Sequence, residues 1–412
     1  MIMPYKTVMA YNKVICIVTH LYPIDNRDYK GGFVRELAIS LCDKGYEVHI
    51  VTPRRLNALK KEKINGVYIH RFSYWGYSKG VQLGKLKGTP VFLLGTLVLS
   101  GIMECAKVVI KCRANIIHAY WVVPGGLIAM ISGLLTNRPV VATAAGSDLN
   151  TASRNRIYQL LIRLTLNGID RLIAVSNSMK QIALSLGLPM KKAVVFPGPV
   201  GIDLDLYTDS HESVSLLNDA PENTHEGVLL LYVGNLTYPK RVDTILRAMK
   251  IVTENVDDAC LMIVGDGDKR LELENLVYDL GINDKVIFKG AVPHEKISDF
   301  MHKSHIFVHC SENEGLPVAI MEAMASGLPV AGSRTGGVPE LIMENETGYI
   351  IDYNDYKGYA EKLVKLVLNH DLRNKMGIKG RELAVSKFSR KIIINKNIEV
   401  YEQLMGGGKK KR

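Results

Sequence analysis

Apolar, β-branched runs alternate with longer stretches of helical periodicity along most of the chain. The first half contains the runs VICIVTHL, VHIVTP, VYIHRF, NIIHAYW, PVVATAAG, RLIAVS and AVVFPG, and the second half contains VLLLYVG, ACLMIVG, KVIFKG, IFVHCS and PVAGS. Strands separated by helices pair into parallel sheets with helices on both faces. The pattern therefore predicts an α/β chain with two doubly wound, Rossmann-like domains.

A segment rich in proline and glycine separates the two series of strands. Residues 196–207 read FPGPVGIDLDLY and predict a hinge, and the polar residues after them predict a connector. We expect an N-terminal domain over 1–200 and a C-terminal domain over 201–388. Residues 389–412 should form a helix that packs back on the N-terminal domain, followed by a basic tail.

The first predicted helix follows Gly31-Gly32. Its apolar residues, among them Leu37 and Leu41, recur at helical spacing. Gly45 is expected to end the helix in the left-handed conformation.

The charges are divided unevenly between the two halves. Residues 1–200 hold 26 basic and 9 acidic side chains, against 26 and 32 in residues 201–412. The basic half predicts an anionic partner such as a phosphate or an acidic lipid surface, with solvated lysines as the alternative. We expect no nucleic-acid partner, since no helix-turn-helix, zinc spacing or RNA-binding signature accompanies the charge.

Three features bear on location. The N-terminus has no apolar core of the secretory type, and no run reaches the roughly 18 apolar residues of a membrane span. The longest run, residues 91–103, follows Lys79, Lys85 and Lys87, which fits a segment on a membrane surface and a buried core helix equally well. The six cysteines include no C-x-x-C pair. We expect reduced cysteines and a cytoplasmic protein, with peripheral contact at the cytoplasmic face of a membrane as one alternative.

The densest chemical signal lies in residues 311–340. Glu314 and Glu322 are separated by seven residues across a Gly-Leu-Pro helix start, with Pro317 expected at the first helical position. Glu314 should lie in the loop after a strand, at the sheet edge where open α/β sheets bind ligands.

The start of this helix predicts a phosphate site. The backbone N–H groups of Gly315, Leu316 and Val318 should lie at the positive end of the helix dipole, where a diphosphate is stabilised. The carboxylates on either side can accept hydrogen bonds from vicinal hydroxyl groups. A ligand with a hydroxyl-rich group at each end of a diphosphate satisfies both, and such a ligand is a nucleotide sugar.

These motifs resemble those of the retaining GT-B glycosyltransferases of glycosyltransferase family 4. The resemblance rests on the two glutamates, on GGVPE at 336–340, on YVGNLTYPKRVDTILRAM and IVGDGDKRLELENLV, and more loosely on Gly31-Gly32, VVPGG and PGPVGID. It implies a GT-B fold, in which two Rossmann-like domains face each other across a cleft. The donor would bind the second domain and the acceptor the first.

The resemblance also implies roles for individual residues. Glu322 would bind the ribose hydroxyls, Glu314 would contact the donor sugar, and Lys240 would neutralise the diphosphate. The family usually has an arginine followed later by Lys-Gly in that segment. Here Asn235 and then Lys240-Arg241 stand at these places, so Arg241 would supply the missing charge.

The first domain offers three candidate positions. Gly32 would bring a backbone N–H to the diphosphate, with an ordinary tight turn as the alternative. His118, expected at a strand end, is either catalytic or structural. Where the family commonly has a histidine before Gly-Ser-Asp this chain has Ala145, and Asp148 would either bind an acceptor hydroxyl or cap a helix.

Other patterns resemble metal or dinucleotide sites without the context that those sites need. Gly265-Asp266-Gly267 lacks the third glycine of a dinucleotide fingerprint. Two D-x-D pairs and a group of histidines resemble metal ligands, namely Asp203 with Asp205, Asp266 with Asp268, and His302, His305 and His309. We expect no metal, and no cofactor besides the nucleotide sugar as co-substrate.

The combined inferences predict a hexosyltransferase of polysaccharide or glycolipid synthesis, and the resemblance alone implies that it retains the anomeric configuration. It would move a sugar from a nucleoside diphosphate sugar to a hydroxyl acceptor that is anionic, lipid-linked or part of a glycan. Because no carboxylate nucleophile is evident in the expected acceptor-side segments, a front-face displacement is the favoured mechanism. A GT-B sugar-nucleotide epimerase and a non-enzymatic basic binding protein are the alternatives.

Overall fold

The computed structural model describes residues 13–25, 28, 31–75, 91–150, 156–208 and 227–406. The chain divides into two compact units. Unit 1 comprises the chain up to Val175, Met179–Val200 and the segment from Ile393 onward, and unit 2 comprises Ser176–Ser178 and Gly201–Ile392. The last helix, α14 (Arg390–Gly406), therefore contributes most of its length to unit 1.

Unit 1 is built on an eight-stranded sheet in the order β3-β4-β2-β1-β5-β6-β7-β8, with β3 and β4 antiparallel and the other pairs parallel. The strands are β1 (Val14–Val18), β2 (Glu47–Pro53), β3 (Lys61–Ile64), β4 (Val67–Phe72), β5 (Ile116–Tyr120), β6 (Val140–Ala144), β7 (Arg171–Ala174) and β8 (Ala193–Val195). The helices before α14 are α1 (Gly32–Asp43), α2 (Val91–Cys112), α3 (Leu127–Thr136), α4 (Ser147–Asn150), α5 (Arg156–Gly168) and α6 (Asn177–Ser185).

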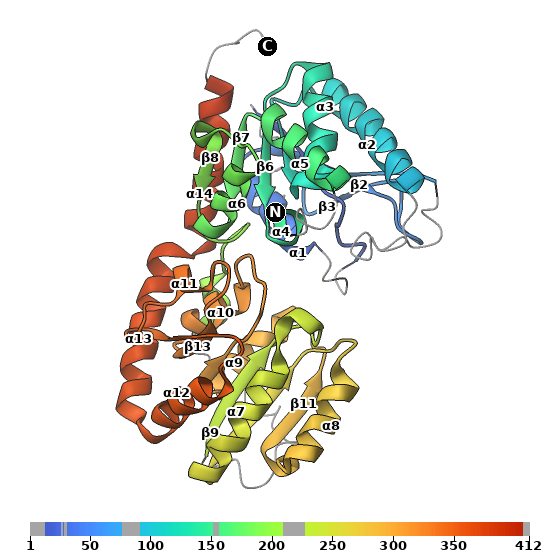
Figure 1. Cartoon of the computed structure of the whole chain (residues 1–412). Helices are drawn as coiled ribbons and strands as arrows, with labels where there is room; N and C mark the ends of the chain where they lie inside the picture. Colours follow the sequence, from blue (N-terminus) through green and yellow to red (C-terminus); the bar gives the residue numbers. More distant parts are fainter. Residues whose placement is uncertain are drawn as a thin grey trace, which may run out of the picture. The chain divides into compact units, whose positions relative to one another are not determined.

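Helices pack on the sheet of unit 1 (Figure 1). The buried apolar side chains of the unit form two separate cores. Leu97 of α2, Ile128 of α3 and Ile162 of α5 belong to one core. Leu37 of α1 and Ile393 of α14 belong to the other. The sheet is therefore buried on both faces, as expected for parallel strands that read as continuous apolar runs.

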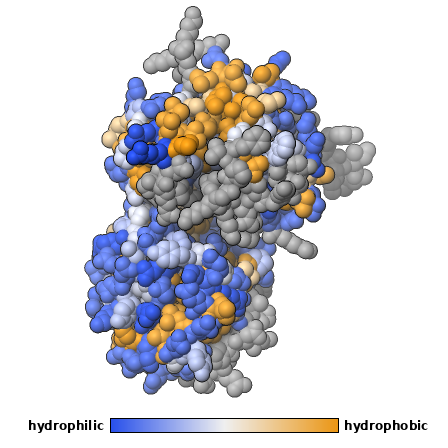
Figure 2. All heavy atoms as spheres, turned by 45° about the vertical axis from the view of Figure 1, so that its right-hand side comes forward, coloured by the Kyte–Doolittle hydropathy of each residue, from blue (hydrophilic) through white to orange (hydrophobic). Residues whose placement is uncertain are grey.

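Helix α2 is longer than the sequence pattern suggested. Its 20-residue part Leu93–Cys112 has a mean hydropathy of 1.8, and among the described residues it is the one helix long and apolar enough to cross a membrane. The expectation that no segment reaches this length is therefore wrong, because the helix continues past Met103 with charged residues only at Glu104, Lys107 and Lys111. The predicted flanking lysines at 79, 85 and 87 lie outside the described residues. Figure 2 shows hydrophobic side chains gathered on the surface of this part of unit 1.

Unit 2 contains a six-stranded, fully parallel sheet in the order β11-β10-β9-β12-β13-β14. Its strands are β9 (Val228–Val233), β10 (Ala259–Val264), β11 (Val286–Gly290), β12 (Ile306–Val308), β13 (Val330–Ser333) and β14 (Gly348–Ile351). Its helices are α7 (Val242–Asn255), α8 (Arg270–Leu280), α9 (Ile297–Lys303), α10 (Val318–Ala325), α11 (Val338–Leu341), α12 (Tyr356–Leu368) and α13 (His370–Lys387). The predicted architecture of two Rossmann-like parallel sheets is confirmed.

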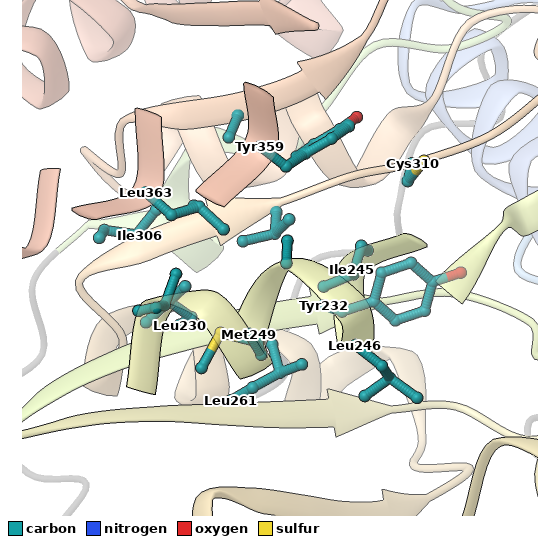
Figure 3. Close-up of a cluster of buried hydrophobic side chains, with 14 of the residues drawn as sticks. Leu230, Tyr232, Ile245, Leu246, Met249, Leu261, Ile306, Cys310, Tyr359 and Leu363 are labelled. Atoms are coloured by element: carbon teal, nitrogen blue, oxygen red, sulfur yellow. The ribbon is translucent and has the colours of Figure 1, made fainter. Parts of the chain in front are cut away.

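The main core of unit 2 lies between the sheet and the helices α7 and α12. Leu230 and Leu261 from the strands meet Met249 of α7 and Leu363 of α12 (Figure 3). Tyr359 of α12 is fully buried, and its hydroxyl donates a 2.8 Å hydrogen bond to the carbonyl of His309. The core thereby holds the segment that follows β12 in place.

Most of the connector predicted after residue 207 lies outside the described residues, as does the basic tail beyond Gly406. The six cysteines form no disulfide, as expected. Unit 1 gives way to unit 2 between Val200 and Gly201, inside the segment predicted as a hinge.

The boundaries of α1 agree with the glycine pattern. Gly31 precedes the helix with φ of 77°, and Gly45 follows it with φ of 84°. A Cβ on Gly31 would lie 2.3 Å from the carbonyl oxygen of Leu21, whereas a Cβ on Gly32 would have no atom within 4 Å. Gly31 is therefore required by the fold, and Gly32 is not.

We expect Gly31→Ala to lower the free energy of unfolding by about 1–3 kcal/mol, because it adds both a left-handed alanine and a backbone clash. Gly32→Ala, the matched control, should change it by less than about 0.5 kcal/mol. Denaturant unfolding followed by circular dichroism measures both. Equal stability of the two variants would contradict the assignment.

Candidate active site

The sheet of unit 2 changes direction between β9 and β12. The chain runs outward from β9 through β10 to β11, and then returns to place β12 on the other side of β9, where Ile306 pairs with Leu230. At such a switch point the loops after two neighbouring parallel strands separate and leave space for a ligand at the carboxyl edge. The loop after β9 carries Lys240 and the loop after β12 carries Glu314.

Hydrogen bonds join these two loops. The carbonyl oxygen of Pro239 accepts from the backbone N–H of Glu312 at 2.7 Å and from the hydroxyl of Ser311 at 2.8 Å. Lys240 is next in the chain, and its ammonium group donates to Oε2 of Glu314 in an ion pair. The structure thus brings together two residues that the sequence analysis assigned to one site.

The Glu314 carboxylate is largely buried and is held in its charged form. Burial by itself would raise its pKa, but the imidazole of His309, with Nε2 3.5 Å from Oε2, and the charge of Lys240 outweigh burial and lower the pKa to about 2. His309 is itself buried, and burial lowers its pKa. Its Nδ1 lies 3.5 Å from the hydroxyl of Ser333 at the end of β13.

The loop after β13 packs against the backbone beside Glu314. The hydroxyl of Thr335 donates to the carbonyl of Ser311 at 2.8 Å, and the N–H of Gly337 donates to the carbonyl of Gly315 at 3.0 Å. A Cβ on Gly336, which has φ of 52°, would lie 1.7 Å from the carbonyl oxygen of Glu314. The Gly-Gly motif is therefore explained by close backbone packing around Glu314.

The helix after Glu314 begins one residue later than predicted. α10 starts at Val318, and Pro317 occupies the preceding cap position with φ of −75° and ψ of 113°. No described residue accepts a hydrogen bond from the backbone N–H of Gly315, Leu316 or Val318. These three donors therefore match the predicted anion site.

Glu322 lies on the buried side of α10. Its side chain is about 5% exposed, and its Oε1 lies 2.8 Å from Nε2 of His294, in the short turn η9 (His294–Lys296). Tyr207 of the turn η5 (Leu204–Tyr207) is also close, since burial and then the Glu322 carboxylate raise the pKa of the Tyr207 hydroxyl. The imidazole and the phenol hold the carboxylate in place.

The second predicted cation, Arg241, is engaged by its neighbours. It has φ of 40°, and its guanidinium donates to Asp243 at 3.1 and 3.2 Å and to Oδ1 of Asn354 at 2.8 Å. The side chain of Asn235 is exposed, and its carbonyl accepts from the Tyr232 hydroxyl at 3.4 Å. Lys240, and not Arg241, is the cation that contacts Glu314.

In unit 1 the switch point lies between β1 and β5. His118 was expected at a strand end, but it is the third of five residues in β5 and is fully buried. Its Nδ1 lies 2.6 Å from the Tyr401 hydroxyl of α14 and its Nε2 2.8 Å from the Thr143 hydroxyl. Burial lowers its pKa to about 3. This environment favours the structural alternative, in which His118 ties β5 to α14.

Asp148 is similarly engaged by the backbone. It is 4% exposed, and its two carboxylate oxygens accept from the N–H of Val122 at 2.8 Å and of Gly146 at 3.0 Å. Burial raises its pKa, while the backbone donors act in the opposite direction. These contacts support the capping alternative, and acceptor binding by Asp148 stays a prediction.

Three of the residues set aside as metal motifs have structural partners, whereas Nε2 of His302 is buried without a hydrogen-bond partner in the described part of the chain. Asp203 caps a short turn and pairs with Arg390, and Asp266 pairs with Arg270. His305 accepts from the backbone N–H of Leu229 at 3.0 Å. Among the described residues no three His, Cys, Asp or Glu side chains gather in a way that would hold a metal ion.

Sequence reasoning did not foresee the contacts of three histidines near the two sheet edges, one of which, His309, it had considered only as a metal-like residue. His309 and His294 each contact one of the two glutamates. In unit 1, the ring of His20 lies 4.2 Å from that of Trp121 at a tilt of 57°, and Trp121 has φ of 64°. His309 directly follows β12, five residues before Glu314, so its place at the end of a strand was a signal that it lies near the site. Nothing in the sequence near His294 indicates its contact with Glu322.

Comparisons with known proteins agree with this geometry. A family model described as "Glycosyl transferases group 1" matches residues 217–383, and one described as "Glycosyltransferase Family 4" matches residues 31–206. The two matches, the paired sheets and the site at the β9–β12 edge define a glycosyltransferase of the GT-B class. The chain belongs to glycosyltransferase family 4.

Individual relatives share the whole length of the chain. It is 27% identical over 382 residues to the N-acetyl-alpha-D-glucosaminyl L-malate synthase of Bacillus anthracis, covering 90% of this chain and 92% of that protein. Sucrose-phosphate synthase from Thermosynechococcus elongatus has a TM-score of 0.77 at 20% identity, covering 96% and 100% of the two chains. HepE of Anabaena, solved in complex with UDP, has a TM-score of 0.77 at 15% identity, covering 95% and 100%.

The low pKa of Glu314 predicts a pH dependence of stability. Because the folded pKa of about 2 lies below the ordinary 4.5, the unfolded chain binds the proton first as the pH falls. The contribution of Glu314, up to about 3 kcal/mol, should be complete above about pH 5 and lost as the pH falls toward 2. Glu314→Gln should therefore flatten the fall in unfolding free energy below pH 5. The control is Glu361→Gln, at a side chain 73% exposed. Denaturant titrations with parallel profiles for wild type and Glu314→Gln would contradict the prediction.

Proposed function

We propose that this chain is a retaining, metal-independent hexosyltransferase that moves a sugar from a nucleoside diphosphate sugar to a hydroxyl acceptor. The observation that carries the proposal is the Lys240–Glu314 ion pair beside the unbonded backbone donors of Gly315 and Leu316. A cation and free N–H groups suit a diphosphate, and a charged carboxylate next to them suits sugar hydroxyls.

Each side chain of the unit 2 site then has a role. Lys240 and the backbone donors stabilise the negative charge that develops on the leaving diphosphate, which is the largest single contribution that such a site can make. Glu314 accepts hydrogen bonds from the sugar, and Glu322 accepts them from the ribose. Gly32 of unit 1 has open space at its Cβ position, and phosphate binding through its backbone N–H stays a prediction.

The proposed reaction needs no base from the protein. The acceptor oxygen forms a bond to the anomeric carbon on the face from which the diphosphate departs. The bond between that carbon and the phosphate oxygen breaks, and the departing oxygen takes the acceptor proton. The burial of His118 and Asp148 supports this scheme, because neither side chain is placed to remove a proton.

The acceptor that we propose is anionic and bears a hydroxyl group. The excess of basic residues in 1–200 supports it. The name of the Bacillus anthracis relative, an L-malate synthase, indicates that this relative makes a product containing the anion malate. A lipid-linked or glycan acceptor with a phosphate would offer the same charge. We further propose that the protein works in the cytoplasm.

Lys240→Ala and Glu314→Gln should each lower the rate of sugar transfer by about 100-fold or more, because each removes a charge at the reacting groups. Lys250→Ala, at a half-buried lysine of α7 that pairs with Glu254, is the control and should retain the wild-type rate. Transfer from radiolabelled nucleotide sugars, starting with UDP sugars, measures the effect. Wild-type rates in both site variants would refute the proposed site, and a new sugar isomer formed without acceptor would identify an epimerase.

Transfer should persist after the enzyme and substrates have been treated with EDTA, since Lys240 and the backbone donors take the place of a divalent cation. Rates measured with EDTA and with added Mg²⁺ should agree within about twofold. A strict requirement for Mg²⁺ would instead point back to the D-x-D residues.

A further inference from the structure

The solvent-facing side of α2 has the wrong polarity for a surface helix in water. Leu97, Cys105 and Val109 face the core, and the opposite side of the helix should therefore be polar. Instead Leu99 and Met103, four residues apart, are each more than 60% exposed. A helix that is apolar on both sides fits an environment that is not water on its outer side.

The neighbouring helices extend this apolar surface. Helix α3 packs beside α2, and α5 packs beside α3. α3 exposes Leu134 and Leu135, and α5 exposes Leu160 and Leu164, all by more than half of their surface. Figure 2 shows the resulting hydrophobic area near the top of the view. We call the outer sides of α2, α3 and α5 the docking face. Contiguous apolar surfaces of this kind mark sites of contact with a protein or a membrane.

Basic residues accompany the apolar ones. Four described basic residues lie on the three helices, Lys107 and Lys111 on α2 and Arg156 and Arg163 on α5, against a single acidic residue, Glu104. Long basic side chains beside an apolar surface suit the interface of a bilayer, where the charge meets lipid phosphates and the apolar groups enter the acyl region.

A basic cavity of about 440 Å³ borders the docking face. Met103 and Lys107 of α2 line it together with Lys60 and Lys61, which no described acidic side chain pairs with. The more deeply buried Arg71 is already bound to Glu62. Glu104 also lines the cavity, 3.8 Å from the ammonium group of Lys107, so the uncompensated positive charge comes from Lys60 and Lys61. The cavity is large enough for a phosphate headgroup and lies directly beside the exposed Met103.

We propose that the docking face seats unit 1 on the surface of a bilayer that contains acidic phospholipids. The headgroup phosphate of one lipid occupies the cavity at Lys60, Lys61 and Lys107, and Leu99 and Met103 enter the interfacial region. The docking is independent of the catalytic proposal, since it needs neither donor nor acceptor. α2 lies on the membrane and does not cross it, because Leu97, Cys105 and Val109 are committed to the core.

Charge argues against a second copy of the chain as the occupant of this face. A symmetric dimer presents the same surface patch from both copies. Such an interface would bring the basic residues Lys107, Arg156 and Arg163 of both copies into one buried patch, and like charges in an interface oppose association. Acidic headgroups complement the same residues.

Flotation of the full-length chain with vesicles tests the proposal. We expect binding to vesicles of phosphatidylcholine mixed with an equal part of phosphatidylglycerol, and about tenfold less to phosphatidylcholine alone. The double variant Leu99→Gln, Met103→Gln should bind the acidic vesicles about tenfold less than wild type. The matched control is Leu368→Gln, Ile378→Gln, which changes two similarly exposed residues of unit 2 and should bind like wild type.

A second variant tests the charged part separately. Lys60→Glu, Lys61→Glu should abolish the preference for acidic vesicles, while its thermal unfolding stays that of wild type, because both lysines are exposed. The basic tail beyond Gly406 is present in every variant and cannot account for a difference between them.

Three results would overturn the proposal. In the first, the wild-type protein does not float with acidic vesicles. In the second, the Gln double variant of α2 floats like the wild type. In the third, light scattering shows a dimer that the same double variant converts to a monomer. Sugar transfer to a soluble acceptor should be unchanged in all of these variants, so loss of docking and failure of the catalytic proposal are distinguishable.

Discussion

The site in unit 2 depends on the adjacency of β9 and β12. These parallel strands are separated by β10 and β11 in the chain but are hydrogen-bonded neighbours in the sheet. Their adjacency places the loops that carry Lys240 and Glu314 side by side, and the carbonyl of Pro239 joins them. A largely buried carboxylate needs such a partner, because a buried charge without compensation costs several kcal/mol. The ion pair and the packing of the two loops therefore stabilise each other.

Unit 1 uses its polar groups differently. The two polar side chains that the sequence analysis singled out in unit 1, His118 and Asp148, form hydrogen bonds inside the fold. His118 binds Tyr401 and Thr143, and Asp148 binds two backbone N–H groups. A buried polar group that is hydrogen-bonded in this way rigidifies its surroundings. In unit 2, by contrast, Lys240 and Glu314 form an ion pair beside three backbone N–H groups that no described residue bonds.

The surface of unit 1 also differs from that of an ordinary water-exposed domain. Its sheet is covered by helices on both faces, yet the layer of α2, α3 and α5 exposes apolar side chains beside basic ones. A catalytic site that recognises soluble phosphates does not need such a face. The apolar and basic side chains of this face are the basis of the proposed contact with a lipid surface, and the core of unit 1 does not use them.

Local patterns determined the elements and much of the unit 2 site, because strand periodicity, glycine at positive φ and the residues after a strand act over a few positions. The start and end of α1 and the loops of Lys240 and Glu314 were readable for that reason. The depth of His118, the contact of His294 with Glu322 and the outward side of α2 were decided only by the tertiary structure. Each depends on which distant segments become neighbours; Tyr401, for example, lies far from His118 in the sequence but bonds to it in the fold. Burial and hydrogen-bond partners follow from that packing and not from local sequence.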